Sequence, residues 1–148
     1  AYIANMYKLG EDRTLSVKGE VDELSVEIQD EKKSIVLPAK RWALFTYMFP
    51  EIQEEVKKLR EKKDVKFFKH IGGAFYVSIT TGYNCVHIHR FYKSRGELKP
   101  RREGLALRLR EWTDLFELLP RLLEDAPDLA AVLPCFCGTC HECCPFDV

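Results

Sequence analysis

Two segments of this chain carry residues whose types and spacing suit binding chemistry. The first, residues 89–102, combines aromatic rings with many basic side chains. Lys and Arg attract the phosphates of a nucleic acid, and exposed rings stack on bases that a duplex would hide, each stack being worth roughly 1–3 kcal/mol. We therefore predict binding of single-stranded nucleic acid, with Tyr76 and Tyr92 as candidate stacking rings and with the candidate cations Arg90, Lys93, Arg95, Lys99, Arg101 and Arg102.

The rings in this set have a second interpretation, which is packing between neighbouring strands. We favour packing for Phe91 and Tyr76, although Tyr76 stays among the candidates. For Tyr92, which stands beside Lys93 and near Arg95, we favour a position that faces the ligand. The alternative for the cations is a solvated rim.

The second segment is rich in cysteine, with five of the six cysteines inside ten residues. Cys137, Cys140 and Cys143 are separated by two residues each, a spacing that lets a turn direct two thiolates at one ion. A tetrahedral zinc is the leading interpretation; reduced thiols, disulfides and an iron–sulfur cluster are the alternatives. Such a thiol cluster suits an intracellular metal site better than secretion. The candidate ligands are Cys135, Cys137, Cys140, His141, Cys143 and Cys144.

The basic segment needs a strand and a turn to position it. Alternation places Val86 and Ile88 on one face of a strand, and His87 and His89 on the other. A turn is expected at 94–96, where Gly96 stands, and a second strand follows. The two strands would form a long basic hairpin with aromatic residues at its root.

A repeat organises the rest of the chain. Trp42 and Trp112 lie seventy residues apart, each in an amphipathic helical pattern and each followed eight residues later by a proline, Pro50 or Pro120. Each proline is expected to end or kink its helix. Alternating runs precede both helices and predict antiparallel strands. We predict an α+β fold with two units, 1–64 and 65–128, and a Cys-rich tail, 129–148.

The charge distribution favours the second unit as the binding unit. The chain has 23 basic and 23 acidic residues, a net charge of zero. Residues 65–110 carry a net charge of +8, whereas 111–148 carry −7 and 1–64 carry −1. The longest apolar stretch is interrupted at Pro134 and falls far short of the ~20 residues that a membrane span needs. We expect no membrane span and no secretory leader.

Residues 66–126 resemble the C-terminal domain of the eukaryotic transcriptional coactivator called positive cofactor four. The most specific part is a Gly-Glu-Leu-Lys-Pro turn at 96–100, followed at a fixed distance by Gly104, a short apolar strand and a helix with Trp112. Residues 73–79 and 86–92 also match the family pattern. The first unit is similar to a shortened, degenerate copy that lacks the binding hairpin.

The resemblance implies a strongly curved four-stranded antiparallel sheet followed by one helix. Family members pair through their helices and bind single-stranded DNA or melted duplex in transcription, replication and repair. This implies a nuclear protein that works with transcription machinery proteins; RNA is an alternative ligand. By the same resemblance, the two copies pair within one chain as a pseudo-dimer, with a homodimer as the alternative.

The family's binding positions fall on identifiable residues of this chain. Tyr92 matches the aromatic at the end of the second strand, and His89 takes a position usually held by Arg. The resemblance assigns the turn lysine to Lys99 and the following arginine to Arg102. The chain departs from the family at Glu103, where a second cation is common, and in the turn at 80–83, which is short and lacks the family's aromatic residue before the glycine. Tyr83, just after that glycine, is the candidate replacement for the stacking ring, and the alternative is that the ring is absent.

No pattern in the sequence points to an enzyme. The chain has no Gly-rich phosphate loop, and the cysteine spacing after Pro134 misses that of the zinc deaminases by one residue. The leading hypothesis is a single-strand-binding transcription or replication cofactor. The alternative is a protein-interaction scaffold with a metal-binding tail and little or no affinity for DNA.

Overall fold

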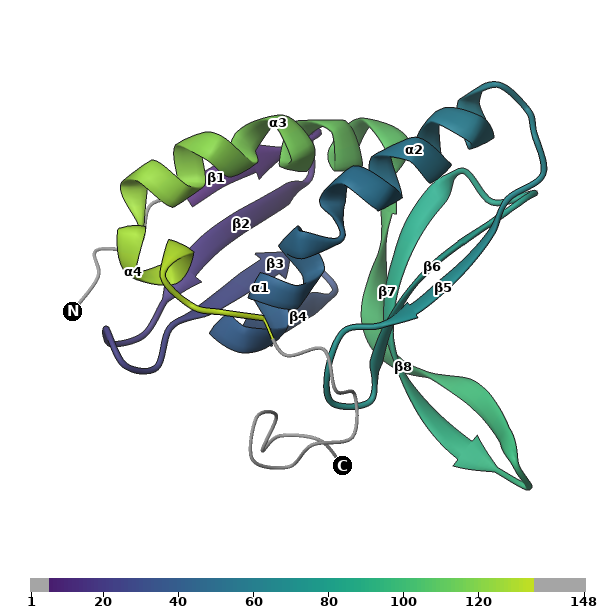
Figure 1. Ribbon diagram of the computed structural model, residues 1–148, viewed down its shortest axis with the longest axis horizontal. Helices are drawn as coiled ribbons and strands as arrows, with labels where there is room; N and C mark the ends of the chain where they lie inside the picture. Colours follow the sequence, from purple (N-terminus) through teal and green to yellow (C-terminus); the bar gives the residue numbers. More distant parts are fainter. Residues whose placement is uncertain (1–5, 135–148) are drawn as a thin grey trace.

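The computed structural model describes residues 6–134, and in this range the chain forms two four-stranded antiparallel sheets and four helices (Figure 1). The predicted α+β class is confirmed. In each sheet the strands follow one another in chain order. The strands are β1 (Met6–Leu9), β2 (Arg13–Lys18), β3 (Ser25–Gln29) and β4 (Ser34–Pro38) in the first sheet, and β5 (Lys66–His70), β6 (Phe75–Thr80), β7 (Cys85–Ser94) and β8 (Glu97–Arg108) in the second.

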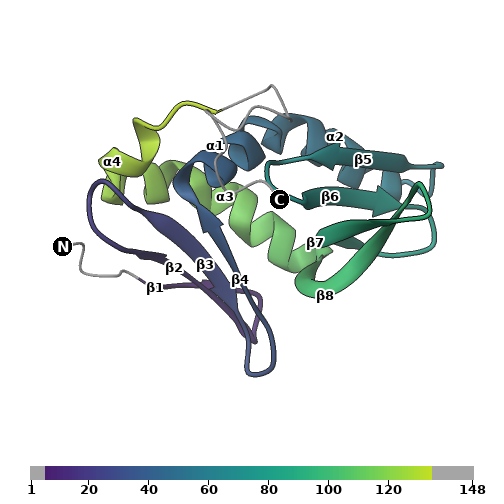
Figure 2. The same ribbon diagram turned by 90° about the horizontal axis from the view of Figure 1, so that it is seen from below.

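The helices lie over one face of the two sheets (Figures 1 and 2). Helices α1 (Ala39–Tyr47) and α2 (Phe49–Arg60) follow the first sheet, and α3 (Leu109–Asp125) and α4 (Pro127–Ala130) follow the second. Within the described range, the inner faces of both sheets and the helices share one hydrophobic core, in which both tryptophans are buried. Burial of this apolar surface is the main stabilising contribution to the fold.

Alternation decides which face of the second sheet is buried. Val86 and Ile88 are fully buried, whereas His87 and His89 on the opposite face are half-buried. The faces predicted from the sequence are confirmed for this strand. The outer face, where the histidines lie, is therefore available to a ligand.

Contacts between the two halves of the chain run in both directions. Arg41, which precedes Trp42, donates from Nε to the carbonyl oxygen of Gly72 in the β5–β6 turn at 3.0 Å. From the other half, Asp114 of α3 accepts a hydrogen bond from the backbone N–H of Gly10 in the β1–β2 turn at 2.7 Å. Each long helical region is thus joined to a turn of the other half's sheet.

The two repeated prolines have different consequences. The chain leaves α1 at Met48 and starts α2 there, so that Pro50 falls in the first helical turn, where a missing N–H costs little. In contrast, α3 continues through Pro120 to Asp125. Of the two expected outcomes at Pro120, an end or a kink, the end is not found, because the buried side chains of Leu115 and Leu122 on either side hold the helix in the core.

Residues 135–148 of the predicted cysteine-rich tail lie outside the described residues, so the predicted zinc ligands at 135–144 are not described by the structure. Among the described helices, none has the length and apolar character to cross a membrane.

Candidate nucleic-acid interface

The predicted hairpin is present and ends in a tight turn. Ser94 and Glu97 are the last paired residues of β7 and β8, which leaves a two-residue loop of Arg95 and Gly96. Both loop residues have positive φ, 52° and 81°, as a type I′ turn requires. The turn matches the right-handed twist of the strands. Because β7 pairs with β6 only as far as Arg90 but with β8 as far as Ser94, the hairpin projects beyond the rest of the sheet (Figure 1).

The pairing of β8 with β7 is irregular at Arg101 and Arg102. His89 pairs with Gly104 and Phe91 pairs with Pro100, so three residues, Arg101 to Glu103, lie opposite the single residue Arg90. Extra residues of this kind bend a strand and increase its twist. Sequence alternation did not predict the irregularity.

Gly104 brings the two strands together at this irregularity. Its φ is +145°, and a Cβ atom placed on it would lie 2.6 Å from Cδ2 of His89 and closer still to the carbonyl oxygen of Ile88. The backbone of β8 therefore passes directly over His89, and only glycine leaves enough room.

Tyr92 is exposed, as predicted, and one face of its ring carries a cation. The ring is 39% exposed, and the guanidinium carbon of Arg101 lies 4.9 Å from its centroid. This is the geometry of a cation–π contact. A base stacking on Tyr92 would meet the free face of the ring or displace Arg101.

Tyr76 belongs to an aromatic cluster on the outer face. Its ring stacks on Phe68 at 4.6 Å between centroids and meets Phe91 edge to face at 5.2 Å. Tyr76 and Phe91 therefore pack against neighbouring rings, as the packing interpretation expected. Phe68 was not among the sequence candidates, yet it is 45% exposed. In strand β5, Phe67 points into the core, so alternation places Phe68 on the outer face, and this pattern could have identified it.

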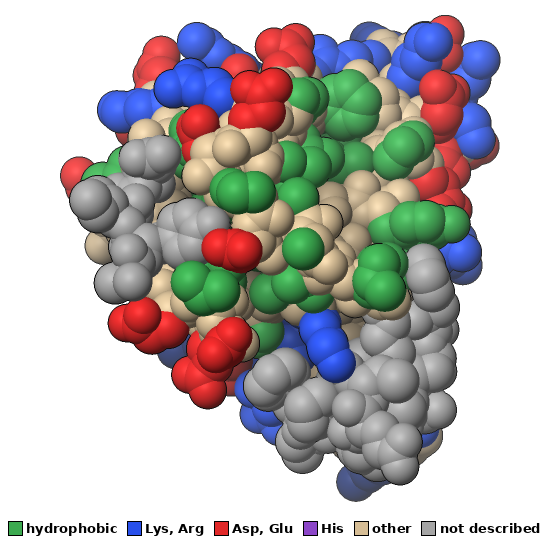
Figure 3. Space-filling model, turned by 60° about the vertical axis from the view of Figure 1, so that its left-hand side comes forward, with side chains coloured by type: hydrophobic (Ala, Val, Ile, Leu, Met, Phe, Trp, Pro, Cys, Tyr) green, Lys and Arg blue, Asp and Glu red, His purple; other side chains and the backbone are tan. Residues whose placement is uncertain are grey.

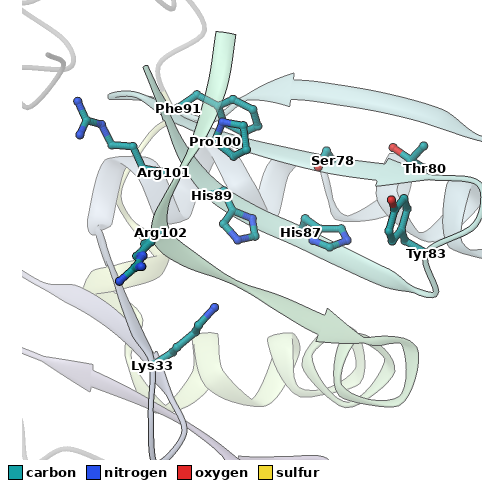
Figure 4. A pocket seen from close by; sticks show the side chains of 10 residues that line it. All are labelled: Lys33, Ser78, Thr80, Tyr83, His87, His89, Phe91, Pro100, Arg101 and Arg102. Carbon is teal, nitrogen blue, oxygen red and sulfur yellow. The ribbon is translucent and has the colours of Figure 1, made fainter. Parts of the chain in front are cut away.

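An open groove of about 480 Å³ crosses the outer face next to this cluster (Figure 4). Basic, imidazole, hydroxyl and aromatic groups line it, and none of the described lining residues is acidic. Tyr83 stands at one end, 62% exposed and 6.0 Å from the ring of His87. The lining residues are Lys33, Ser78, Thr80, Tyr83, His87, His89, Phe91, Pro100, Arg101 and Arg102.

The two histidines of the groove are uncharged near neutral pH. Burial lowers the pKa of His87 below its usual value. Burial also lowers the pKa of His89, and the nearby His87 and Lys33 lower it further. Their rings lie 5.7 Å apart. His89 therefore offers a neutral ring where the family resemblance implied the charge of an arginine.

The cations of the interface differ in their availability. Arg90 forms an ion pair with Glu103 at 3.3 Å, although exposed pairs of this kind contribute only about 0–1 kcal/mol. The other basic candidates form no ion pair with any residue in the range 6–134 and remain open to a ligand. They are Lys93, Arg95, Lys99, Arg101 and Arg102.

The described residues include one cysteine, Cys85 of β7, which is a half-buried free thiol. Burial and the nearby Glu111 raise its pKa, so it is a weak metal ligand at neutral pH. In the range 6–134, no three His, Cys, Asp or Glu side chains are grouped to hold a metal ion. The zinc prediction therefore rests on the tail alone.

No family model, curated protein or solved structure matches this chain. The resemblance to the positive cofactor four domain therefore stays a prediction from the sequence.

Proposed function

We propose that this chain binds single-stranded nucleic acid on the outer face of its second sheet and along the β7–β8 hairpin. The observation that carries the proposal is the composition of the groove, which has cations, hydroxyls and rings and, among its described lining residues, no carboxylate. Such a surface attracts a chain of phosphates without local repulsion. DNA is the favoured ligand, and RNA is the alternative.

The exposed rings favour a single strand over a duplex. Tyr83 and Phe68 on the outer face of the sheet, and Tyr92 on the hairpin, are each more than a third exposed. Unpaired bases stack on such rings, whereas a duplex keeps its bases stacked on one another. The cations of the hairpin then follow the backbone between stacked bases.

We further propose that the two sheet-and-helix units pair as an internal dimer. The contacts of Arg41 with Gly72 and of Asp114 with Gly10 support this proposal, because each joins the helical region of one unit to a turn of the other. Exchange of contacts in both directions is typical of two-fold pairing. A single chain would then supply both partners, and a homodimer is the alternative.

The proposed cellular role is that of a transcription or replication cofactor in the nucleus, with transcription machinery proteins as partners. This part of the proposal rests on the sequence resemblance described above. The proposed protein is a binding module and not an enzyme.

Fluorescence anisotropy with labelled single-stranded and duplex oligonucleotides tests the proposal. We expect tighter binding of the single strand, and a logarithmic salt dependence whose slope falls by about 1.4 in Lys99→Ala/Arg102→Ala, since each single-strand phosphate contact contributes about 0.7. The control, Lys40→Ala/Lys57→Ala, removes two exposed helical charges away from the groove and should bind as the wild type does. Absence of binding by the wild type at low salt would refute the proposal.

An apolar groove supports the scaffold as the second candidate. Trp42 and Tyr47 of α1, Leu119 and Leu123 of α3, and Leu129 of α4 line a groove of about 280 Å³. Figure 3 views the molecule from the side on which α4 lies in Figure 1, and hydrophobic side chains gather on this face. Trp42 and Leu129 are buried at the base of this groove, whereas Tyr47 is 65% exposed beside them, and exposed apolar surface is one mark of a protein-interaction site. A scaffold would keep this groove and show no affinity for the oligonucleotides.

A further inference from the structure

We propose that Lys33, in the first unit, contacts a phosphate of the strand bound in the groove of the second unit. The inference rests on the proposed single-strand binding and adds a binding residue to it. The ligand group is a phosphodiester, held between Lys33 and the arginines of β8. The first unit would then take part in binding instead of serving only as a structural partner.

Lys33 is a residue of the first unit in a groove that is otherwise lined by residues of the second unit. Lys33 lies in the turn between β3 and β4, more than fifty residues before His89 in the sequence, yet both line the same groove. Strand β4 lies against β8, which brings the turn close to Arg102. In Figure 4 the Lys33 side chain extends toward the imidazoles of the second sheet.

The amine of Lys33 is available for an anion. It forms no ion pair with any residue between 6 and 134, and no acidic side chain of that range lines the groove. The nearby positive charge also contributes to the lowered pKa of His89. Asp30 of the same turn feels the charge of Lys33 without forming an ion pair with it, so a phosphate placed between Lys33 and Arg102 could contact both cations without breaking an ion pair.

The turn that carries Lys33 is held in place by hydrogen bonds and ion pairs. Asp30 accepts hydrogen bonds through Oδ1 from the backbone N–H groups of Lys32 and Lys33, at 2.8 and 2.7 Å. Arg13 pairs with Asp30 at 3.5 Å and with Glu111 of α3 at 3.4 Å. The turn is therefore linked to the second unit, so that Lys33 is positioned before a ligand arrives.

Lys32 offers a matched control for Lys33. The two lysines are adjacent in the same turn, both are exposed, and only Lys33 lines the groove. Neutralising either one changes the net charge of the protein equally. A difference in binding between the two variants therefore reports a local contact and not the overall charge.

The test compares Lys33→Gln and Lys32→Gln by anisotropy with labelled oligothymidine across a range of salt. We expect Lys33→Gln to weaken binding about three- to tenfold at low salt and to lower the salt slope by about 0.7. Lys32→Gln should leave the slope unchanged, and Lys33→Arg should restore it. Equal effects of the two Gln variants, with wild-type binding intact, would overturn this inference alone.

The parent proposal fails in a different way. If the wild type and Lys99→Ala/Arg102→Ala both show no binding, the single-strand function is refuted and the Lys33 contact with it. If Lys99→Ala/Arg102→Ala loses affinity but Lys33→Gln does not, the function stands and the first unit makes no contact. Thermal unfolding of each variant checks that the fold is retained.

Discussion

The indole nitrogen Nε1 of Trp112 donates a hydrogen bond to Oε1 of Gln53 at 2.7 Å, which joins α3 of the second half to α2 of the first. The corresponding donor in the first half is Trp42, seventy residues earlier. The position that corresponds to Gln53, seventy residues later, is Leu123, whose side chain has no hydrogen-bond acceptor. The Nε1 atom of Trp42 is buried and has no hydrogen-bond partner among residues 6–134, and Trp42 and Leu123 line the same groove.

Removing the acceptor of Trp112 should destabilise the protein. We expect Gln53→Leu to lower the free energy of unfolding by about 1–3 kcal/mol, because a buried indole N–H would lose its partner. Denaturant unfolding measures the change. Gln53→Glu keeps an acceptor oxygen and should recover most of the loss; an equal loss in both variants would contradict this explanation.

Adding the missing acceptor should have the opposite effect. In Leu123→Gln, the new amide oxygen can reach the Nε1 atom of Trp42 if the two halves are related by the same geometry. We expect the free energy of unfolding to rise by about 1 kcal/mol. Leu123→Met, which supplies length without a strong acceptor, is the control. If Leu123→Gln is no more stable than Leu123→Met, the two halves do not share this geometry.

Tyr92→Ala should weaken single-strand binding by about 1–3 kcal/mol, because it removes a stacking surface. The loss should be similar for oligonucleotides of different sequence, since every base has a face that can stack. Tyr92→Phe keeps the ring and should bind nearly as the wild type does. A loss in Tyr92→Phe as large as in Tyr92→Ala would mean that the hydroxyl, and not the ring, makes the contact.

Gly104→Ala should disturb the fold more than Gly82→Ala does. Both glycines have positive φ, +145° and +97°, so either substitution strains the backbone. At Gly104 the new methyl group would also collide with Ile88 and His89, whereas nothing lies within 4 Å of the corresponding position at Gly82. Differential scanning calorimetry should show the larger decrease in melting temperature for Gly104→Ala; equal decreases would contradict the close approach of the strands.

Stability should fall as the pH falls through the histidine range. The pKa values of His87 and His89 are lowered in the folded protein, so the unfolded chain binds more protons below about pH 6.5. The folded state therefore loses stability from about pH 6.5 downward, until the lowered pKa values are passed. Denaturant unfolding between about pH 8 and pH 5 measures the loss, which should be smaller in His89→Gln.

Nucleic-acid affinity should rise over the same range. His89 is faced by His87 on its own strand, by Lys33 from the first sheet and by Arg101 and Arg102 of β8. A bound phosphate offsets these positive charges and favours the protonated ring, so binding takes up a proton. Anisotropy titrations should show tighter binding at lower pH in the wild type and a flatter profile in His89→Gln. An affinity independent of pH in the wild type would show that His89 takes up no proton on binding.

The sequence by itself determined the local features of the second sheet. Alternation in β7 identified Val86 and Ile88 as buried and the two histidines as outward-facing, and the turn at Gly96 was predicted from its residue types. These features depend on the period of a strand and on the backbone freedom of glycine, both of which act between neighbouring residues. The excess of cations in 65–110 likewise required no structure.

Only the tertiary structure decided which distant residues share a surface. The groove contains Lys33 because β4 packs against β8, and no local pattern around Lys33 indicates this. The path of α3 through Pro120, and the lack of an acceptor for Trp42 within the described part of the chain, also depend on packing between the two halves. Such contacts join residues far apart in the chain, and their free energy comes from the shared core, which local propensity does not encode.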